Sequence, residues 1–194
     1  MIRGKLCYDS QDGLTLLEVA LALALAGILI GFVWAVLSTS LYNSHLSTTE
    51  QGITTLAANI REYFRDRQIA LVGDISNAIA INANLVPNEL LIGGAVKYGL
   101  GVGANAAITI SYDKANCGTS SFEFTMATMQ GQACNDLLTH LVGTVSSTKS
   151  QAISQVLVGG TAILNSATGA LTSPTAISTS CTNGTKVEIC FTQF

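Results

Sequence analysis

The sequence predicts an α+β protein in which a long N-terminal α-helix packs on a small antiparallel β-sheet. Three observations predict this class. The first is an uninterrupted apolar run over residues 14–37. The second is the helical spacing of apolar residues that follows it, and the third is alternation with a period of two in short segments of the second half. A chain of 194 residues is also long enough to bury a sizeable core.

Charged residues are scarce. They make up 11% of the chain, while 48% is hydrophobic and the mean hydropathy is +0.45; soluble domains average about a quarter charged residues. Residues 19–49 contain no Asp, Glu, Lys or Arg, and the last 80 residues carry only five charges. This is not the composition of an ordinary cytoplasmic domain. The net charge of −3 and the lack of a basic run argue against nucleic acid as a direct partner.

The apolar run over residues 14–37 has the length of a membrane span. Its 24 residues would extend about 36 Å as a helix, which exceeds a hydrocarbon core of roughly 30 Å. No good small-residue cleavage site follows it, so we expect the segment to be retained as an anchor. Glu18 lies inside the run, where an unpaired carboxylate is costly and normally has a partner.

The residues before Glu18 form a pattern together with it. A short polar leader ends in Gly13 and is followed by Leu14-Thr15-Leu16-Leu17-Glu18. This arrangement resembles the prepilin signature of type IV pilins and related pseudopilins: a charged leader that ends in Gly, a hydrophobic first mature residue, Thr or Ser next, and Glu fifth. The match covers residues 13–37. Leu at the first mature position and 194 − 13 = 181 mature residues are most like type IVb major pilins, although a leader of 13 residues is short for that branch.

The resemblance implies a processing and export route. A prepilin peptidase would cut on the cytoplasmic side between Gly13 and Leu14, and the new Leu14 amine would be N-methylated. Arg3 and Lys5 favour a leader that stays in the cytoplasm. The precursor would lie in the inner membrane of a bacterium, expected to be Gram-negative, and the mature subunit in an extracellular pilus. An inner-membrane platform protein and an assembly ATPase would be its partners, and no cofactor is implied.

In such a filament, Glu18 of one subunit would neutralise the Leu14 amine of its neighbour. The pair would lower the cost of burying both charges and would fix the axial offset between subunits. Gly27 and Gly31 have GxxxG spacing within the span. They could form a packing face between helices, reflect the higher Gly content of membrane helices, or allow local unwinding during assembly.

The helix is expected to continue past the span, to residue 69. Apolar residues recur at helical spacing in this second half, which predicts a one-sided stripe against a globular head: Ile53, Leu56, Ala57, Ile60, Tyr63 and Phe64. We therefore divide the chain into a leader (1–13), a membrane or filament-core half-helix (14–37), an amphipathic half-helix (38–69) and a head (70–194).

The head combines predicted strands with one helix. Residues 108–112, 122–126 and 187–191 alternate with a period of two and predict strands, and residues 130–142 predict a helix. The pilin fold that the resemblance implies has the same architecture. The tract 143–180, rich in Ser, Thr, Ala and Gly, is either a weakly structured surface excursion, or strands and a short helix around residues 152–158 that contact neighbouring subunits. Its apolar residues favour an ordered surface excursion.

Four of the five cysteines remain after the leader is removed: Cys117, Cys134, Cys181 and Cys190. An even number outside the inner membrane predicts two disulfides, and the lack of a CxxC pair argues against zinc. Asn183-Gly184 predicts a two-residue hairpin in which Cys181 faces Lys186. Cys190 would then lie about 13 Å from Cys181, beyond the roughly 7 Å between Cα atoms that a disulfide allows. Two connectivities remain.

Two disulfide connectivities of the four cysteines remain, and similarity to type IVb pilins implies the one with a bond from a head helix to the C-terminal region. That bond fits Cys134 with Cys181, which leaves Cys117 to pair with Cys190.

Catalytic chemistry is not indicated. The glycine-rich residues 99–103 lack the full dinucleotide-binding spacing, and His45 and His140 lie on different predicted elements without a nucleophile motif. We therefore expect a structural subunit of a type IVb-like pilus rather than an enzyme. The alternatives are a minor pilin or pseudopilin of a type II secretion or DNA-uptake machine, and a membrane-tethered adhesive domain that never polymerises.

Overall fold

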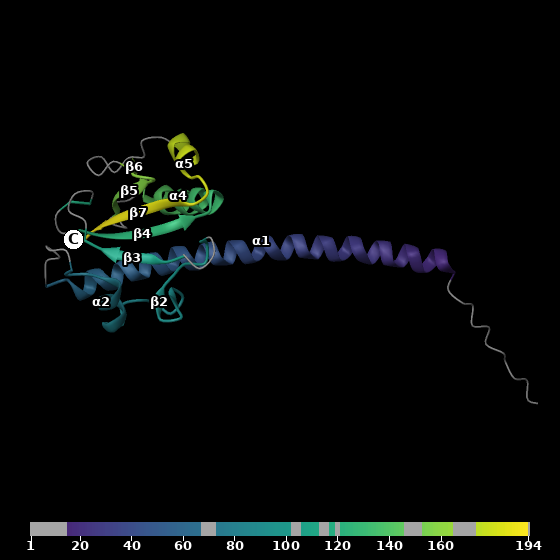
Figure 1. The fold of residues 1–194 in the computed structure, drawn as a ribbon, viewed down its shortest axis with the longest axis horizontal. Coiled ribbons are helices and arrows are strands. Elements are labelled where there is room, and N and C mark those ends of the chain that lie inside the picture. The colour runs from purple at the N-terminus through teal and green to yellow at the C-terminus, as the bar shows by residue number, and fades with distance from the viewer. Residues whose placement is uncertain are drawn as a thin grey trace, which may run out of the picture. The chain divides into compact units, whose positions relative to one another are not determined.

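The computed structural model describes residues 15–66, 73–101, 106–112, 117–118, 121–145, 153–164 and 174–193. The chain divides into two compact units, Met1–Leu41 and Tyr42–Phe194. The longest element is helix α1, Leu16–Tyr63 (Figure 1). In the second unit, the part of α1 from Tyr42 onward packs with an antiparallel sheet, so the expected α+β class is confirmed.

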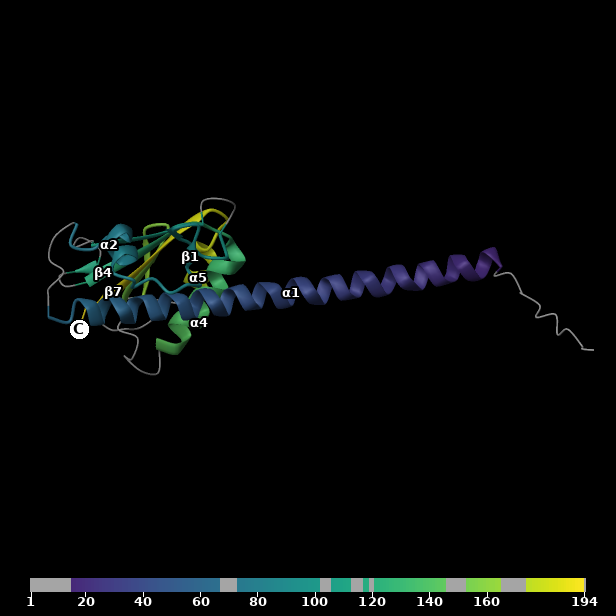
Figure 2. The same ribbon diagram turned by 90° about the horizontal axis from the view of Figure 1, so that it is seen from below.

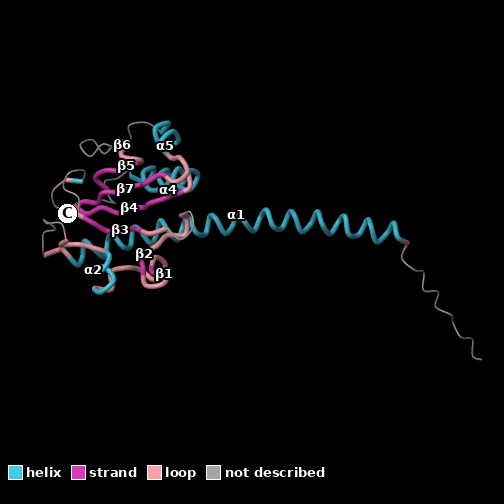
Figure 3. Tube along the Cα trace, viewed as in Figure 1, coloured by secondary structure: helices cyan, strands magenta, loops and turns pink. Residues whose placement is uncertain are grey.

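The second unit is built on a five-stranded antiparallel sheet (Figure 3). Its strands, in spatial order, are β3 (Ile108–Ser111), β4 (Ser121–Met129), β7 (Thr185–Thr192), β5 (Ile153–Val158) and β6 (Thr161–Leu164). The three strands expected near residues 108, 122 and 187 are confirmed. The last strand in the chain, β7, occupies the centre of the sheet, between β4 and β5. The C-terminal segment therefore holds the two halves of the sheet together.

Two helices cover one face of this sheet. Opposite residues on neighbouring strands share a face, and on this face they are Phe122 with Phe191, Phe124 with Ile189, and Met126 with Val187. The three phenylalanine rings contact one another, with centroids 5.0 to 5.5 Å apart. Helices α1 and α4 (Gly131–Val145) lie side by side (Figure 2), and Arg61 of α1 lies over the ring of Phe191. The expected helix at 130–142 is thereby confirmed.

The buried stripe of α1 follows the expected spacing, since Ile53, Leu56, Ala57 and Ile60 are all buried. The helix ends earlier than residue 69, however, at Tyr63. The carbonyls at a helix end need partners outside the helix, and the next one, Phe64 O, accepts a hydrogen bond from Gln193 Nε2 at 2.6 Å. That bond fixes Phe64, which is buried, beside the end of β7.

Residues 77–96, for which the sequence predicts no helix or strand, contribute a short helix and a small hairpin. Helix α2 spans Asn77–Asn82, and β1 (Leu91–Ile92) pairs with β2 (Ala95–Val96). Gly93 and Gly94 form the turn between these strands with φ of 62° and 77°, which non-glycine residues rarely adopt. Leu90, just before the hairpin, is buried against α1, where a Cβ added at Gly52 would lie 2.7 Å from its Cγ.

Asn77 protects the edge of the sheet. Its side-chain Nδ2 donates to Ile108 O at 2.7 Å, and its Oδ1 accepts from Ile110 N at 2.6 Å. The amide thus takes the place of a neighbouring strand along β3. Unpaired edge groups are a template for aggregation, and this contact covers two of them.

The expectation of a surface excursion over 143–180 is wrong for the described part of that tract. Residues 153–164 form β5 and β6, and β5 pairs with the central strand β7. Ile153, Val156 and Leu164 are buried because they complete the core. Of the alternative with strands and a short helix around residues 152–158, the strand is present over the described residues, as Ile153–Val158, and the helix is not. A helix does occur further along, as α5 (Pro174–Ser180).

The expected hairpin at Asn183-Gly184 is also wrong. The residues before it form α5 rather than a strand, and the chain turns from that helix into β7. The Asn-Gly pair has a different use here, because Asn183 Oδ1 accepts a hydrogen bond from Gly131 N at the start of α4, at 2.9 Å. Cys181 therefore does not face Lys186 across a hairpin. A Cys181–Cys190 bond is not excluded by such a hairpin, but it does not form, because Cys181 is bonded to Cys134 and Cys190 to Cys117.

Candidate functional site

The first compact unit presents an apolar helical surface. Every residue from 15 to 41 is exposed, including large side chains such as Leu23, Phe32 and Trp34. The helix contains an 18-residue window of mean hydropathy 2.6, and by length and composition it could cross a membrane. Exposing so many apolar side chains to water is unfavourable. This segment therefore requires an apolar surrounding, either lipid or other protein.

Glu18 lies in the first turn of this helix and is bound to Thr15. Its carboxylate Oε2 accepts from Thr15 N at 2.9 Å and from Thr15 Oγ1 at 3.0 Å. In return, Glu18 N donates to Thr15 Oγ1 at 3.3 Å. Together these bonds form a capping box, in which two backbone N–H groups at the helix start are satisfied by side chains. The carboxylate is exposed rather than buried.

Thr15, the partner of Glu18, is not among the site residues that the sequence predicts. In the sequence it is part of the leader signature, but a Thr followed three residues later by Glu is also a signal for a helix start. The other two residues of the expected processing site, Gly13 and Leu14, lie outside the described residues. The expected cleavage and methylation therefore stay predictions.

Gly27 and Gly31 both lie within the exposed part of α1. The helix is continuous through both, and a Cβ added at either would meet nothing within 4 Å. In the isolated chain their backbone is thus open to close approach by another surface. This geometry leaves the expected packing role as a prediction.

In the second unit, polar contacts join α1 to α4. Tyr42 Oη donates to Asp136 Oδ2 at 2.8 Å, and Glu50 Oε2 lies 3.5 Å from His140 Nδ1. Burial, the hydrogen bond to the Asp136 carboxylate and its negative charge raise the pKa of Tyr42 to about 12. The phenol is therefore neutral at physiological pH and acts as a donor.

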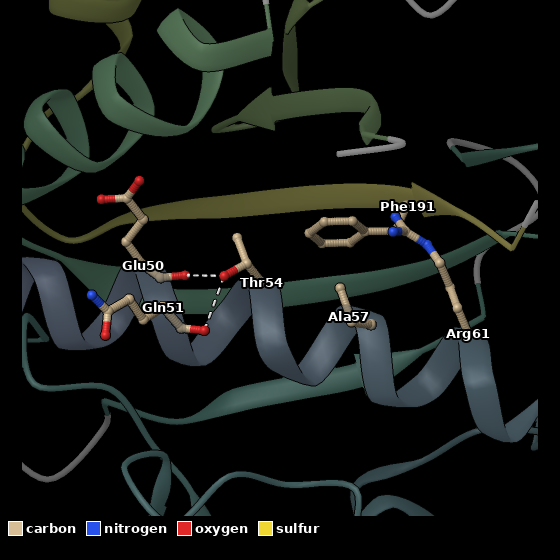
Figure 4. Close-up of a pocket in the computed structure, with 7 residues that line it drawn as sticks. Glu50, Gln51, Thr54, Ala57, Arg61 and Phe191 are labelled. Carbon is tan, nitrogen blue, oxygen red and sulfur yellow. Dashed lines mark hydrogen bonds between the residues drawn. The ribbon is translucent and has the colours of Figure 1, made fainter. Parts of the chain in front are cut away.

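A groove runs along α1 between Glu50 and Arg61 (Figure 4). Thr54 and Ala57 lie along it, and the ring of Phe191 faces it from β7. The Arg61 guanidinium carbon lies 5.6 Å from the centre of that ring, and Arg61 Nε donates to Thr192 O at 2.9 Å. Arg61 thus fastens the end of α1 to the end of the central strand.

Two disulfides join segments of the second unit. One links Cys117 to Cys190 with a Cα–Cα distance of 5.3 Å, and the other links Cys134 to Cys181 at 5.6 Å. These are the pairs implied by the resemblance. The first ties the central strand β7 to the segment between β3 and β4, and the second ties α4 to the residue that follows α5. Among the described residues, no group of three or more His, Cys, Asp or Glu is placed to hold a metal ion.

No protein-family model and no curated protein matches the sequence. Among solved structures, the chain is similar to a crystal structure of a type IV b pilin from Salmonella typhi. The two share 18% sequence identity with a TM-score of 0.49, and the similarity covers 75% of this chain and 97% of that one.

Proposed function

We propose that this chain is the structural subunit of a type IV pilus of the IVb kind, and that it polymerises through its N-terminal helix. The observation that carries the proposal is the start of α1, where an exposed apolar helix begins with Thr15 and Glu18 in a capping box. The sequence places Gly13 and Leu14 directly before it. Glycine in that position would let a peptidase approach the backbone closely.

The chemistry of assembly follows from this arrangement. Cleavage after Gly13 would leave a cationic amine on Leu14, one residue before the cap. In a filament core both that amine and Glu18 would leave water, so each would need an opposite charge. Glu18 of a neighbouring subunit would supply it, exchanging its internal bonds to Thr15 for a charge-assisted bond.

The membrane would hold the subunit before assembly. The exposed apolar face over residues 16–41 would be covered first by lipid and then by the helices of other subunits. Transfer between two apolar surroundings costs little hydrophobic free energy, so polar groups such as Glu18 would decide the register. An assembly ATPase and a platform protein would drive filament assembly. The pilus would lie outside the cell, where the two disulfides persist.

The direct test is to shear filaments from the surface of cells that express the chain and to identify their subunit. We expect thin filaments in electron micrographs and one dominant band whose N-terminal peptide begins at Leu14 with a methylated amine. A chain that is absent from the filaments, while its loss impairs protein secretion, would identify a pseudopilin. A chain retained at full length in the membrane would contradict the proposal altogether.

A further inference from the structure

Two hydrogen bonds join the start of α4 to the residues just before β7. Asn183 Oδ1 accepts from Gly131 N at 2.9 Å, and Gly184 N donates to Met129 O, also at 2.9 Å. We call this pair of bonds the α4 clasp. Both of its bonds involve the dipeptide Asn183-Gly184, so the clasp fixes the side chain of one residue and the backbone nitrogen of the next.

The Cys134–Cys181 disulfide closes the same region. Cys134 lies three residues after Gly131, and Cys181 lies two residues before Asn183, so the bond ties together the two segments that the clasp joins. The backbones are in close contact there, since a Cβ added at Gly131 would lie 2.8 Å from Cys181 O. Opening the clasp therefore requires the segments to separate against a covalent link.

Asn183-Gly184 is the only Asn-Gly pair in the sequence, and both residues are exposed. Such a pair is prone to deamidation, because a glycine has no Cβ to keep its nitrogen away from the preceding side chain. Gly184 N attacks Asn183 Cγ and forms a cyclic succinimide. The Gly184 N–H proton passes to solvent, and the side-chain nitrogen of Asn183 leaves as ammonia.

Water then opens the succinimide in one of two ways. Cleavage of the new bond between Gly184 N and Asn183 Cγ gives an aspartate in an ordinary main chain. Cleavage between Gly184 N and the backbone carbonyl carbon of residue 183 gives an isoaspartate, in which the main chain runs through the former side chain. In both cases one water is consumed and one ammonia is released overall.

We propose that Asn183 is a latent deamidation site, kept unreactive by the α4 clasp, which the Cys134–Cys181 disulfide holds closed. Both reacting groups are engaged in the clasp. Gly184 N must leave Met129 O before it can lose its proton and reach Cγ, and Asn183 Oδ1 is fixed at Gly131 N. A donor at Oδ1 polarises the side-chain carbonyl, but no attack follows while the nitrogen is held elsewhere.

The turn around the pair gives further restraint. Thr185 N donates to Thr182 O at 3.2 Å, and Gly184 has a φ of 82°, as the third residue of a type II turn requires. Side-chain bonds between Thr182 and Thr185 close the same turn. Ring closure would have to rotate a backbone that these bonds hold.

The two products would have different effects on α4. An aspartate at position 183 keeps an oxygen that can accept from Gly131 N, and its charge is favourable at a helix N-terminus. An isoaspartate adds a methylene to the main chain and shifts the carboxylate, so the clasp is lost. The folded structure thus protects the start of α4 from an irreversible change.

The test measures deamidation in the full chain. The folded protein in detergent micelles is incubated at mildly alkaline pH, and the peptide that contains Asn183 is followed by mass spectrometry with fragmentation to distinguish isoaspartate. The same chain, unfolded in urea with its disulfides reduced and alkylated, is the reference. We expect the folded chain to react about ten- to a hundredfold more slowly, because two hydrogen bonds must open first. Equal rates in the two states would overturn the proposal.

Paired cysteine variants test the part played by the disulfide. Replacing Cys134 and Cys181 together by Ser should accelerate deamidation of folded chain about tenfold, without exceeding the rate of the unfolded chain. The matched control replaces Cys117 and Cys190, which make no bond of the clasp, and should stay close to the wild type. Equal acceleration in both variants would report general loss of stability and would contradict the role of the Cys134–Cys181 bond.

Hydrogen exchange in the wild-type chain gives a second measurement that needs no variant to fold. The amides of Gly131 and Gly184 should both be protected, and to a similar degree, because they open in the same event. Exchange at the Gly184 amide as fast as in the unfolded chain would show that its nitrogen is free to react, and would overturn the proposal.

Discussion

Thr15 and Glu18 satisfy each other's hydrogen-bonding groups at the start of α1. These bonds explain how an apolar helix can contain a carboxylate even without a second subunit. The two roles of Glu18 are compatible if the internal bonds break when a neighbouring amine arrives. The cap would then stabilise the free subunit and be exchanged during assembly.

Replacing Thr15 by Ala should weaken the first turn of α1. The variant loses the Oγ1 that accepts from Glu18 N and donates to its carboxylate. Loss of such a cap costs about 0.5–2 kcal/mol. Hydrogen exchange at the Glu18 amide in micelles should accelerate correspondingly, by about two- to thirtyfold, while Thr15→Ser should exchange like the wild type. Equal exchange in Thr15→Ala and the wild type would show that the cap does not stabilise the helix.

Gly52 is required by close packing rather than by backbone conformation. A Cβ at this position would lie 2.7 Å from Leu90 Cγ, and Leu90 is 1% exposed and has little room to move. Gly52→Ala should therefore destabilise the second unit by about 1–3 kcal/mol despite the better helix propensity of Ala. Denaturant unfolding measures this, and Gly27→Ala, which meets nothing within 4 Å, is the matched control. The prediction fails if Gly52→Ala is as stable as the wild type or more so.

Tyr42 should make the second unit sensitive to alkali. Its pKa is raised to about 12 from an ordinary value of 10.0, so the folded protein favours the neutral phenol. The resulting stability is fully present below pH 10 and is lost as the pH rises through about 12. Unfolding free energies measured across this range should fall for the wild type and fall less for Tyr42→Phe. Tyr98, whose pKa burial also raises to about 12, should account for part of the remainder.

Some of the residues that matter at the start of α1 and in the disulfides can be identified from the sequence, and others cannot. Glu18 stood out because a charge in an apolar run is costly, but its partner Thr15 was missed because the leader pattern already accounted for it. The pairing of Cys134 with Cys181 followed from a resemblance. Spacing alone could not give it, because the hairpin assumed at Asn183 does not form and that residue caps α4 instead.

Helix α4 depends on a residue from a distant segment. Asn183 Oδ1 accepts from Gly131 N in its first turn. Asn183→Ala should cost about 0.5–2 kcal/mol of unfolding free energy because that N–H loses its partner. Asn183→Asp keeps the acceptor oxygen and adds a favourable negative charge at a helix N-terminus, so its stability should match or exceed that of the wild type. Thermal unfolding of the two variants tests this, and equal losses in both would refute the capping role.

Elements with a clear period were predicted, and those determined by long-range pairing were not. Strands β3, β4 and β7 alternate clearly, and α4 has an apolar face. Strand β5 reads ISQVLV, a short apolar run in which helix and strand cannot be separated by period. Its conformation is decided by pairing with β7, whose position at the centre of the sheet no local pattern reveals.

The composition of the whole chain reflects two different surfaces. The charge-free stretch 19–49 is mostly an exposed apolar helix, suited to lipid or to other helices. The low charge of the last 80 residues belongs instead to a folded unit whose strands are largely buried. Broad neutral faces would allow many copies to pack together without mutual repulsion. Both features agree with the proposed role, that of a subunit that lies in a membrane before it joins a filament.

Filament formation by Glu18→Ala shows whether Glu18 pairs with the Leu14 amine of a neighbouring subunit. We expect the variant to enter the membrane and to lose its leader as the wild type does, because neither step needs the carboxylate. Filaments should be absent from sheared material, since the Leu14 amine would have no partner in the filament core. Glu18→Asp, which keeps the charge on a shorter side chain, should retain some assembly. Filaments of Glu18→Ala in wild-type amount would contradict the pairing on which the account depends.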